Sequence, residues 1–322
     1  MNNLAILIPA YNEEMTIGKV ISDVQRETKN IPDTAIYVYD NNSKDNTVDI
    51  AKKSGAIVRH EYAQGKGAVI RRMFREIDAD VYIMIDADDT YPVDVIEKMY
   101  NKVKNKSVDM VVGDRLSSTY FTENKRLFHN FGNTLVRNLI NRFFKTNIRD
   151  ILTGYRAFSY RFVKTFPVLS RGFEIETEMS IHAAEYNMLV ENQVVDYRDR
   201  PEGSESKLNT LQDGFSVLIT LSNLFRTYHP LAFYSVFSAV FLGLSTVLFI
   251  FRVFLPYSST HTVENFPTLI VSTILLVLSF ITFFSGAILD SIQSTNRRNF
   301  ELNLIQVEMK KQKMDKENEA EI

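Results

Sequence analysis

Residues 81–89 read VYIMIDADD, five apolar residues that run directly into a cluster of three carboxylates. A short apolar run that ends in polar residues is typical of a β-strand followed by a loop. The same pattern recurs along the N-terminal half of the chain. We predict strands at Leu4–Pro9, Ala35–Tyr39, Ala56–Arg59, Val81–Ile85 and Met110–Val112, alternating with helices at Met15–Glu27, Asp45–Ser54, Gly67–Ile77 and Val93–Val103. This order predicts an α/β fold with a mostly parallel, Rossmann-like sheet.

Polar segments follow four of the predicted strands at the point where each strand ends. They are Pro9-Ala10-Tyr11-Asn12-Glu13, Asp40-Asn41-Asn42-Ser43-Lys44-Asp45, Gln64-Gly65-Lys66-Gly67 and Asp86-Ala87-Asp88-Asp89. Each segment alone has an ordinary explanation as a helix cap or a turn. In a parallel sheet, however, all four meet at one edge, and α/β proteins bind their ligands at that edge. The coincidence favours a binding site.

The acidic segment after the fourth strand indicates what this edge binds. Asp86 and Asp88 offer hard oxygen ligands, which Mg²⁺ and Mn²⁺ prefer together with phosphate oxygens and water. A nucleoside diphosphate would supply those phosphates. The glycine pattern of dinucleotide-binding proteins is missing after the first strand, and the chain has no P-loop sequence, which argues against NAD binding and P-loop NTPase chemistry.

Composition excludes further classes of function. The chain carries 37 Lys and Arg against 39 Asp and Glu, a net charge of −2, so we expect no nucleic-acid partner. It has no cysteine, which excludes disulfides, thiolate metal sites and cysteine nucleophiles. The apolar residues are unevenly spread, because Leu231–Phe251 and Thr268–Leu289 contain no charged residue. Each window is long enough to cross a bilayer, and a pair of buried core helices is the alternative.

The distribution of charge around these windows predicts a domain organisation. Lys and Arg are frequent after the second window, and the connection between the windows is short, so both chain ends are expected in the cytoplasm. We predict a catalytic domain over residues 1–208 and an amphipathic helix on the membrane surface over 209–229. Two transmembrane helices follow over 230–292. The charged remainder, 293–322, is expected to be a solvated helix or a frayed end.

The motifs together resemble glycosyltransferase family 2, which has the GT-A fold. The resemblance is carried by Ile8-Pro9-Ala10-Tyr11-Asn12-Glu13-Glu14, Asp40-Asn41-Asn42-Ser43, Gly65-Lys66-Gly67-Ala68 and Asp86-Ala87-Asp88. A closer match, to polyprenol-phosphate glycosyltransferases related to dolichol-phosphate mannose synthase, continues in Gly113-Asp114-Arg115, Asn130-Phe131-Gly132-Asn133, Asp150–Phe158, Glu174–Glu178 and Arg200–Lys207. It covers nearly all of the chain except the charged tail, and bacterial members similar to it also end in two transmembrane helices.

The sheet edge and the resemblance together assign roles to individual residues. Nucleotide contacts are expected from Pro9, Tyr11, Glu13, Asp40, Lys66, Asp86 and Ala87, and metal ligands from Asp86 and Asp88. The resemblance implies an acceptor-phosphate site of Arg115 and Arg200 with either Arg126 or His129, and sugar contacts from Asp150, Gly154, Tyr155 and Glu176. Asp150, Arg115 and Arg200 are the predicted catalytic residues, although Asp150 fits a helix cap equally well, and Glu176 has an alternative as a surface carboxylate. Relatives often carry a metal-contacting Gln where this chain has Thr90, which puts a third protein ligand in doubt.

The resemblance implies an inverting hexosyltransferase of the plasma membrane, with two membrane spans and a cytoplasmic catalytic domain. The donor would be UDP-glucose or UDP-N-acetylglucosamine, and the acceptor polyprenyl (undecaprenyl) phosphate. The lipid-linked sugar would serve cell-envelope glycan modification. Alternatives are GDP-mannose as donor, or a non-catalytic nucleotide-binding membrane protein. The chain has no tryptophan, which argues against a processive polysaccharide synthase with its Gln-x-x-Arg-Trp motif. We also expect contact with membrane lipid and a homo-oligomer.

Overall fold

A computed structural model describes residues 1–117, 141, 147–172, 174–196, 198, 222–223 and 225–320, the last three of these by their backbone alone. The chain divides into two compact units. The first comprises Met1–Phe215 together with Leu302–Ile322, and the second comprises Ser216–Glu301.

The first unit is built on a seven-stranded sheet with the strand order β3-β2-β1-β4-β6-β5-β7. The strands are β1 (Asn2–Ala10), β2 (Thr34–Asp40), β3 (Ile57–His60), β4 (Ala79–Met84), β5 (Met110–Asp114), β6 (Arg156–Ser159) and β7 (Val190–Val194). Strand β6 runs antiparallel to both of its neighbours, and the other pairs are parallel. The predicted α/β fold with a mostly parallel sheet is therefore confirmed.

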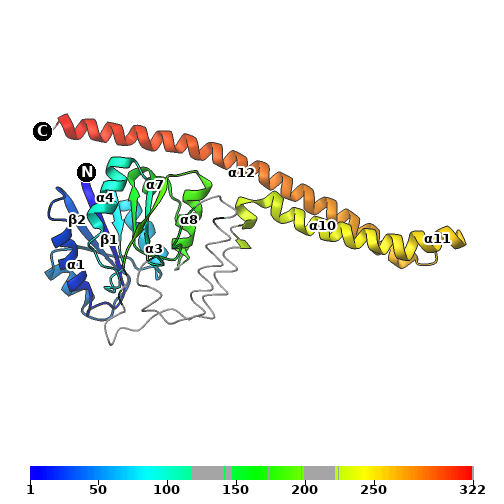
Figure 1. Ribbon diagram of the computed structural model, residues 1–322, viewed down its shortest axis with the longest axis horizontal. Coiled ribbons are helices and arrows are strands. Elements are labelled where there is room, and N and C mark those ends of the chain that lie inside the picture. Colours follow the sequence, from blue (N-terminus) through cyan, green and yellow to red (C-terminus); the bar gives the residue numbers. More distant parts are fainter. Residues whose placement is uncertain are drawn as a thin grey trace. The chain divides into compact units, whose positions relative to one another are not determined.

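Helices cover both faces of this sheet (Figure 1). They are α1 (Ile17–Glu27), α2 (Thr47–Lys53), α3 (Lys66–Glu76), α4 (Ile96–Lys106), α7 (Tyr160–Thr165) and α8 (Ile175–Glu185). On one face, Leu4, Ile6 and Ile8 of β1 share a core with apolar residues of α1 and α4, because alternate strand residues point to the same side. On the other face, Phe158 of β6 packs against Phe74 of α3 and Phe162 of α7, with ring centroids 5.7 and 4.9 Å apart.

The strand directions bring the polar loops together where the parallel strands have their carboxyl ends. We call this side of the sheet the ligand edge. The parallel strands β1, β2, β4 and β5 all end there, and the antiparallel β6 begins there. Arg156, the first residue of β6, pairs with Met84 at the end of β4 and with Val112 near the end of β5. The segment that precedes β6 therefore lies beside the loop that carries Asp86.

The second unit contains a pair of long apolar helices. Helix α10 (Pro230–Phe249) continues through a π-helical turn (Ile250–Phe254) into α11 (Leu255–Thr260). Helix α12 spans Phe266–Ala320, and its part from Leu302 onward belongs to the first unit. Both helical stretches are long and apolar enough to cross a membrane. Small residues line their contact: the Ser245 hydroxyl donates to the Ser272 carbonyl at 2.7 Å, and the Ser238 hydroxyl lies 3.0 Å from the Ser279 carbonyl. Such residues let helix backbones approach closely in lipid.

The predicted amphipathic helix over 209–229 falls largely outside the described residues. Residues 222–223 and 225–228 are helical, and α10 follows with Pro230 as its first residue.

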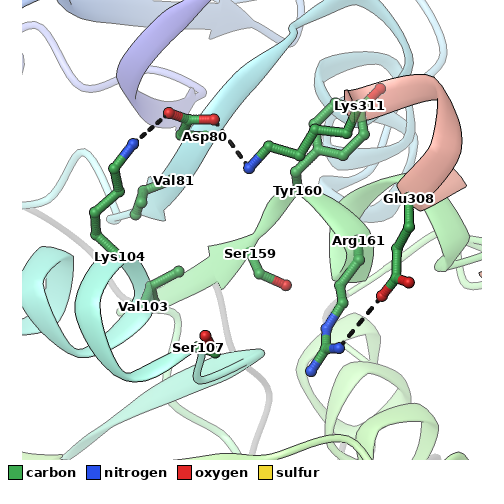
Figure 2. Close-up of a pocket in the computed structure, with 10 residues that line it drawn as sticks. All are labelled: Asp80, Val81, Val103, Lys104, Ser107, Ser159, Tyr160, Arg161, Glu308 and Lys311. Atoms are coloured by element: carbon green, nitrogen blue, oxygen red, sulfur yellow. Dashed lines mark hydrogen bonds and ion pairs between the residues drawn. The ribbon is translucent and has the colours of Figure 1, made fainter. Parts of the chain in front are cut away.

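The charged end of α12 is a mostly exposed helix, and one face of it contacts the sheet unit. The contacts use the edge opposite the ligand edge, where β4 begins and β6 ends (Figure 2). They are Lys311 Nζ to Asp80 Oδ1 at 3.0 Å, Glu308 Oε1 to Arg161 at 3.5 Å, and Met314 Sδ to the Tyr160 hydroxyl at 3.8 Å. The three tail residues recur every third position, so they share one face of the helix.

We expect Lys311→Glu to loosen this tail. The change replaces an attraction to Asp80 by a repulsion, so backbone amide exchange of residues 302–316 should rise several-fold in hydrogen–deuterium exchange. Lys313→Glu is the matched control, because Lys313 is exposed and pairs with Glu317 of the same helix. Equal exchange in the two variants would contradict a role for the Lys311–Asp80 pair in holding the tail.

Helix α8 is buried along its whole length and contains a histidine in an apolar setting. The rings of Phe166 and Tyr186 lie 5.0 and 4.8 Å from the ring of His182. Burial lowers the pKa of His182 from 6.5 to about 3. Between these two values the unfolded chain takes up a proton that the folded chain does not, so acidification below pH 6.5 favours unfolding.

The free energy of unfolding should therefore fall by roughly 2 kcal/mol between pH 7 and pH 5 through this one group. His182→Leu removes the titrating group, so its unfolding free energy should change less over the same interval. Denaturant titrations at both pH values, with the full chain in detergent, measure the difference. A pH dependence identical to that of the wild type would contradict this assignment.

Candidate functional site

Lys66 connects two acidic side chains at the ligand edge of the sheet. It is the first residue of α3 and follows Gly65, whose φ of 126° suits glycine. Its Nζ lies 2.6 Å from Asp86 Oδ1 and 2.7 Å from Glu176 Oε1. Lys66 and Glu176 are almost fully buried, whereas the Asp86 side chain is 24% exposed. The three-membered cluster thus opens toward solvent on the Asp86 side.

Burial and neighbouring charge act against each other in this cluster. Burial alone would lower the pKa of Lys66, but the charges of Asp86 and Glu176 raise it overall, so the ammonium stays protonated. Burial raises the pKa of Glu176, and Asp86 acts in the same direction against the opposing effect of Lys66. The second carboxylate oxygen of Glu176, Oε2, is buried and makes no hydrogen bond within the described part of the chain. An oxygen of this kind suits a ligand hydroxyl as its partner.

The loop after β4 presents the two predicted metal ligands. Asp88 Oδ1 accepts hydrogen bonds from the Thr90 hydroxyl at 2.7 Å and from the Thr90 amide at 3.2 Å. Thr90 thus orients the Asp88 carboxylate. Gly154 packs directly against Asp86, since a Cβ at this glycine would lie 2.8 Å from Asp86 Cγ. Only a residue without a side chain lets the two loops approach so closely.

The donor set at this loop fits Mg²⁺ or Mn²⁺ held jointly with a diphosphate. The protein supplies two carboxylates, and the described residues contain no cluster of three or more His, Asp or Glu side chains suited to a metal ion. Mg²⁺ is commonly bound by one or two carboxylates together with substrate phosphates and water. Asp86 and Asp88 would be the ligands from the protein.

Side chains lock the loops after β1, β2 and β3 together. The backbone amide of Asn12 donates to the Ser43 hydroxyl at 2.9 Å, and the backbone amide of Glu13 donates to the Thr47 hydroxyl at 2.8 Å. The side-chain carbonyl of Asn41 accepts from the Gly65 amide at 2.7 Å. These contacts hold the loops bearing Pro9, Tyr11, Glu13, Asp40 and Lys66 in one rim. The sequence did not indicate that the side chains of Ser43, Thr47 and Asn41 connect these loops.

Asp40 is almost fully buried at the end of β2. Its carboxylate accepts from the Ser43 amide at 3.3 Å and lies 3.2 Å from His60 Nδ1. A buried carboxylate at this position can accept a hydrogen bond from the N–H of a nucleobase.

Arg115, which follows β5, and Asp150, which precedes β6, form a two-pronged ion pair. Arg115 Nε lies 2.7 Å from Asp150 Oδ2, and a terminal nitrogen lies 3.1 Å from Oδ1. Asp150 is fully buried, and the Arg115 side chain keeps 12% of its surface exposed. The carboxylate therefore fixes the plane of the guanidinium. In this structure Asp150 binds an arginine, which fits an orienting role better than a helix cap.

Tyr91 joins this ion pair to the acidic loop, a link that the sequence did not reveal. The guanidinium of Arg115 lies 5.7 Å from the centre of the Tyr91 ring. The Tyr91 hydroxyl lies 3.3 Å from both the Thr153 hydroxyl and the Gly154 amide. Tyr91, Gly154 and Asp86 thus connect the guanidinium to the acidic pair through direct contacts.

The structure separates one predicted residue, Tyr155, from the ligand edge. The Tyr155 side chain is wholly buried in the core, with its ring 5.5 Å from that of Tyr91, so its position suits packing better than sugar contact. Gly154 faces Asp86, which suits close packing of the loop. Ala87 is buried beside the two acidic residues. Arg126, His129 and Arg200 lie outside the described residues.

Comparisons with known proteins identify the family of the chain. Residues 5–168 match the family described as Glycosyl transferase family 2. Glycosyltransferase AglJ of Haloferax volcanii is 31% identical over 263 residues, covering 81% of this chain and 85% of the relative. The dolichyl-phosphate hexose transferase of the same organism is 28% identical, covering 67% of this chain and 91% of the relative.

A solved structure supports the fold independently. Glucosyl-3-phosphoglycerate synthase from Mycobacterium tuberculosis, crystallised with Mn²⁺, UDP-glucose and phosphoglyceric acid, aligns with a TM-score of 0.54 and 20% identity, over 69% of this chain and 79% of that chain. This level of similarity establishes a GT-A-like α/β domain. The family match over about half of the chain and the similarity to AglJ establish the rest: the chain belongs to glycosyl transferase family 2 and is a glycosyltransferase.

Proposed function

We propose that this protein transfers a hexose, with inversion at the anomeric carbon, from UDP-glucose or UDP-N-acetylglucosamine to a polyprenyl phosphate. One observation carries the proposal. An acidic pair suited to a metal–diphosphate and a guanidinium fixed by a buried carboxylate lie at the same sheet edge, joined through Tyr91 and Gly154. The first suits a nucleotide sugar, and the second suits a phosphate acceptor.

On the donor side, the rim of loops would hold the nucleotide, with Asp40 at the base and Pro9, Tyr11, Glu13 and Ala87 around it. Asp86 and Asp88 would hold Mg²⁺ or Mn²⁺, which when bound neutralises charge on the leaving diphosphate. Lys66 adds a protonated ammonium next to the carboxylate of Asp86. Glu176 would accept a hydrogen bond from a sugar hydroxyl through Oε2, because Lys66 contacts the other carboxylate oxygen, Oε1.

On the acceptor side, a lipid phosphate is already largely ionised near neutral pH, so it needs no strong general base. It needs cationic groups that hold it near the sugar. Arg115 would contact it in the geometry set by Asp150, and Arg200 with Arg126 or His129 would complete the site. A polyprenyl carrier also agrees with the dolichyl-phosphate hexose transferase among the relatives.

The two long apolar helices would anchor the enzyme where its lipid acceptor resides. Anchoring raises the effective concentration of a membrane-bound substrate. We place the protein in the plasma membrane with the catalytic domain in the cytoplasm, and the product would serve cell-envelope glycan modification. We further propose that it acts as a homo-oligomer.

The test is to incubate membranes containing the protein with a panel of radiolabelled nucleotide sugars and to extract lipid-linked product. Label from a UDP-hexose in the lipid fraction supports the proposal. Label from GDP-mannose alone would show that the donor is GDP-mannose and not a UDP-sugar. Nucleotide binding without any transfer would show that the protein binds nucleotides without catalysis.

Arg200→Ala should damage acceptor use more than donor binding. A guanidinium makes a two-pronged contact with phosphate oxygens that alanine cannot replace. We expect a higher acceptor KM or a lower kcat, with nucleotide affinity nearly unchanged. Calorimetry of nucleotide binding and acceptor titration decide this. Loss of nucleotide affinity with normal acceptor kinetics would move Arg200 to the donor site.

A further inference from the structure

The largest side chain that is fully buried in the described part of the protein belongs to an arginine, Arg156. It is the first residue of β6, in the middle of the sheet. Its Nε donates to the Thr153 carbonyl at 3.0 Å, and one terminal nitrogen donates to the Ile151 carbonyl at 2.6 Å. The other terminal nitrogen donates to the Ser180 hydroxyl of α8 at 2.9 Å.

These partners are neutral, which is unusual for a buried charge. Among the described residues no carboxylate lies within ion-pair distance of Arg156. Burial lowers the pKa of Arg156 to about 10, against the opposing charges of Glu176 and Asp150, so the side chain remains protonated at neutral pH. A buried guanidinium without a direct counter-ion is costly for folding, and stability alone is a poor explanation for it.

The hydrogen bonds of Arg156 instead fix the backbone of the loop that precedes β6. Ile151 and Thr153, whose carbonyls accept from Arg156, lie between two residues that contact the candidate site. Asp150 on one side fixes Arg115, and Gly154 on the other packs against Asp86. The loop therefore contacts both the Arg115 guanidinium, through Asp150, and Asp86, through Gly154. The hydrogen bonds from Arg156 hold this loop in place.

The third bond of Arg156 reaches a different element. The Ser180 hydroxyl that accepts from Arg156 in turn donates to the Glu176 carbonyl at 2.9 Å, one turn earlier in α8. Glu176 is the partner of Lys66. One planar side chain thus links the loop of Asp150 to the helix of Glu176. Lysine could not replace it, because an ammonium lacks the forked geometry that satisfies separate acceptors.

We propose that Arg156 is a positioning residue for sugar transfer, which holds the Asp150–Gly154 loop and α8 in the relative arrangement that the reaction requires. It contacts neither substrate and acts through Asp150 and Gly154. The inference rests on the proposed function, since it assumes that these residues serve the transfer reaction.

The test uses Arg156→Lys in the full chain in detergent, with Arg161→Lys as control. Arg161 is five residues further along, is bound by the buried Asp109, and lies at the opposite edge of the sheet. We expect Arg156→Lys to lower kcat about 100-fold, because small displacements of reacting groups have large effects on rate, with both KM values within about threefold of the wild type. Arg161→Lys should retain kcat. Equal kcat in the two variants, corrected for folded fraction by circular dichroism, would overturn the proposal.

A double variant identifies the route of the effect. If Arg156 acts through the loop, Arg156→Lys combined with Asp150→Asn should lose little more than Asp150→Asn alone. Independent losses that multiply would overturn it.

Hydrogen–deuterium exchange separates this inference from the proposed function. Peptides covering residues 147–157 should exchange several-fold faster in Arg156→Lys than in the wild type, whether or not the protein transfers sugar to lipid. Unchanged exchange would overturn the positioning role. If the wild type transfers no sugar but exchange is faster in Arg156→Lys, the result would support the positioning of the loop by Arg156 and contradict the proposed reaction.

Discussion

Asp88→Asn is expected to reduce sugar transfer to below about one thousandth of the wild-type rate while leaving the fold intact. The amide keeps the shape of the carboxylate and can still accept from the Thr90 hydroxyl, so the loop after β4 should persist. What disappears is one of the two negative charges available for a divalent cation. Product formation over a range of Mg²⁺ and Mn²⁺ concentrations measures the effect.

The adjacent residue provides a matched control. Asp89 is an acid in the same loop, but its carboxylate binds Lys19 at 2.7 Å, and its φ of 58° is a conformation that asparagine tolerates. Asp89→Asn should therefore keep transfer near the wild-type level. If both variants lose activity equally, the loop needs its total charge and the assignment of Asp88 as a ligand fails. Near-normal, metal-dependent activity in Asp88→Asn would contradict it directly.

Asp150→Asn should impair acceptor use about 100-fold, with nucleotide affinity preserved. The substitution is isosteric, but it replaces a charged two-pronged partner of Arg115 by a neutral amide, so the guanidinium loses its fixed plane. Steady-state kinetics with a short-chain polyprenyl phosphate, paired with calorimetry of the nucleotide, resolve the two effects.

The structure also offers a control for the structural part of that change. Asp109 is another buried aspartate that binds an arginine, Arg161, through both carboxylate oxygens, at the edge of the sheet opposite the candidate site. Asp109→Asn should lower stability and leave kcat of the folded protein unchanged. Loss of nucleotide affinity in Asp150→Asn, with normal acceptor kinetics, would place Asp150 in the donor site instead.

The apolar runs of the N-terminal half predicted the first five strands and the helices between them because each strand there is a short apolar segment followed by polar residues. Strand β6 escaped prediction for a physical reason. It has four residues and begins with the buried Arg156, so its sequence lacks the pattern of a core strand. Strand β7, Val190–Val194, has three consecutive polar residues between its two valines and is partly exposed, so it lacks the alternating pattern of a core strand. Both depend on pairing partners that are distant in sequence.

The residues of the candidate site were predictable to the extent that they follow strand ends. Asp86, Asp88, Lys66 and Asp40 all lie at the predicted edge. The bridge from Lys66 to Glu176 was not predictable, because the two residues are far apart along the chain and meet only in the folded protein. Tyr155 shows the converse, since it lies within a motif but its side chain enters the core.

The most direct test of the central claim is transfer by the purified full chain in lipid nanodiscs that either contain or lack undecaprenyl phosphate. Radiolabelled UDP-glucose and UDP-N-acetylglucosamine are supplied with Mg²⁺ or Mn²⁺, and both released UDP and organic-extractable sugar are measured. We expect one equivalent of sugar-phosphate lipid for each UDP released, and no release without the lipid phosphate. UDP release that is equal with and without undecaprenyl phosphate, or no lipid-linked sugar with any nucleotide donor, would contradict the account.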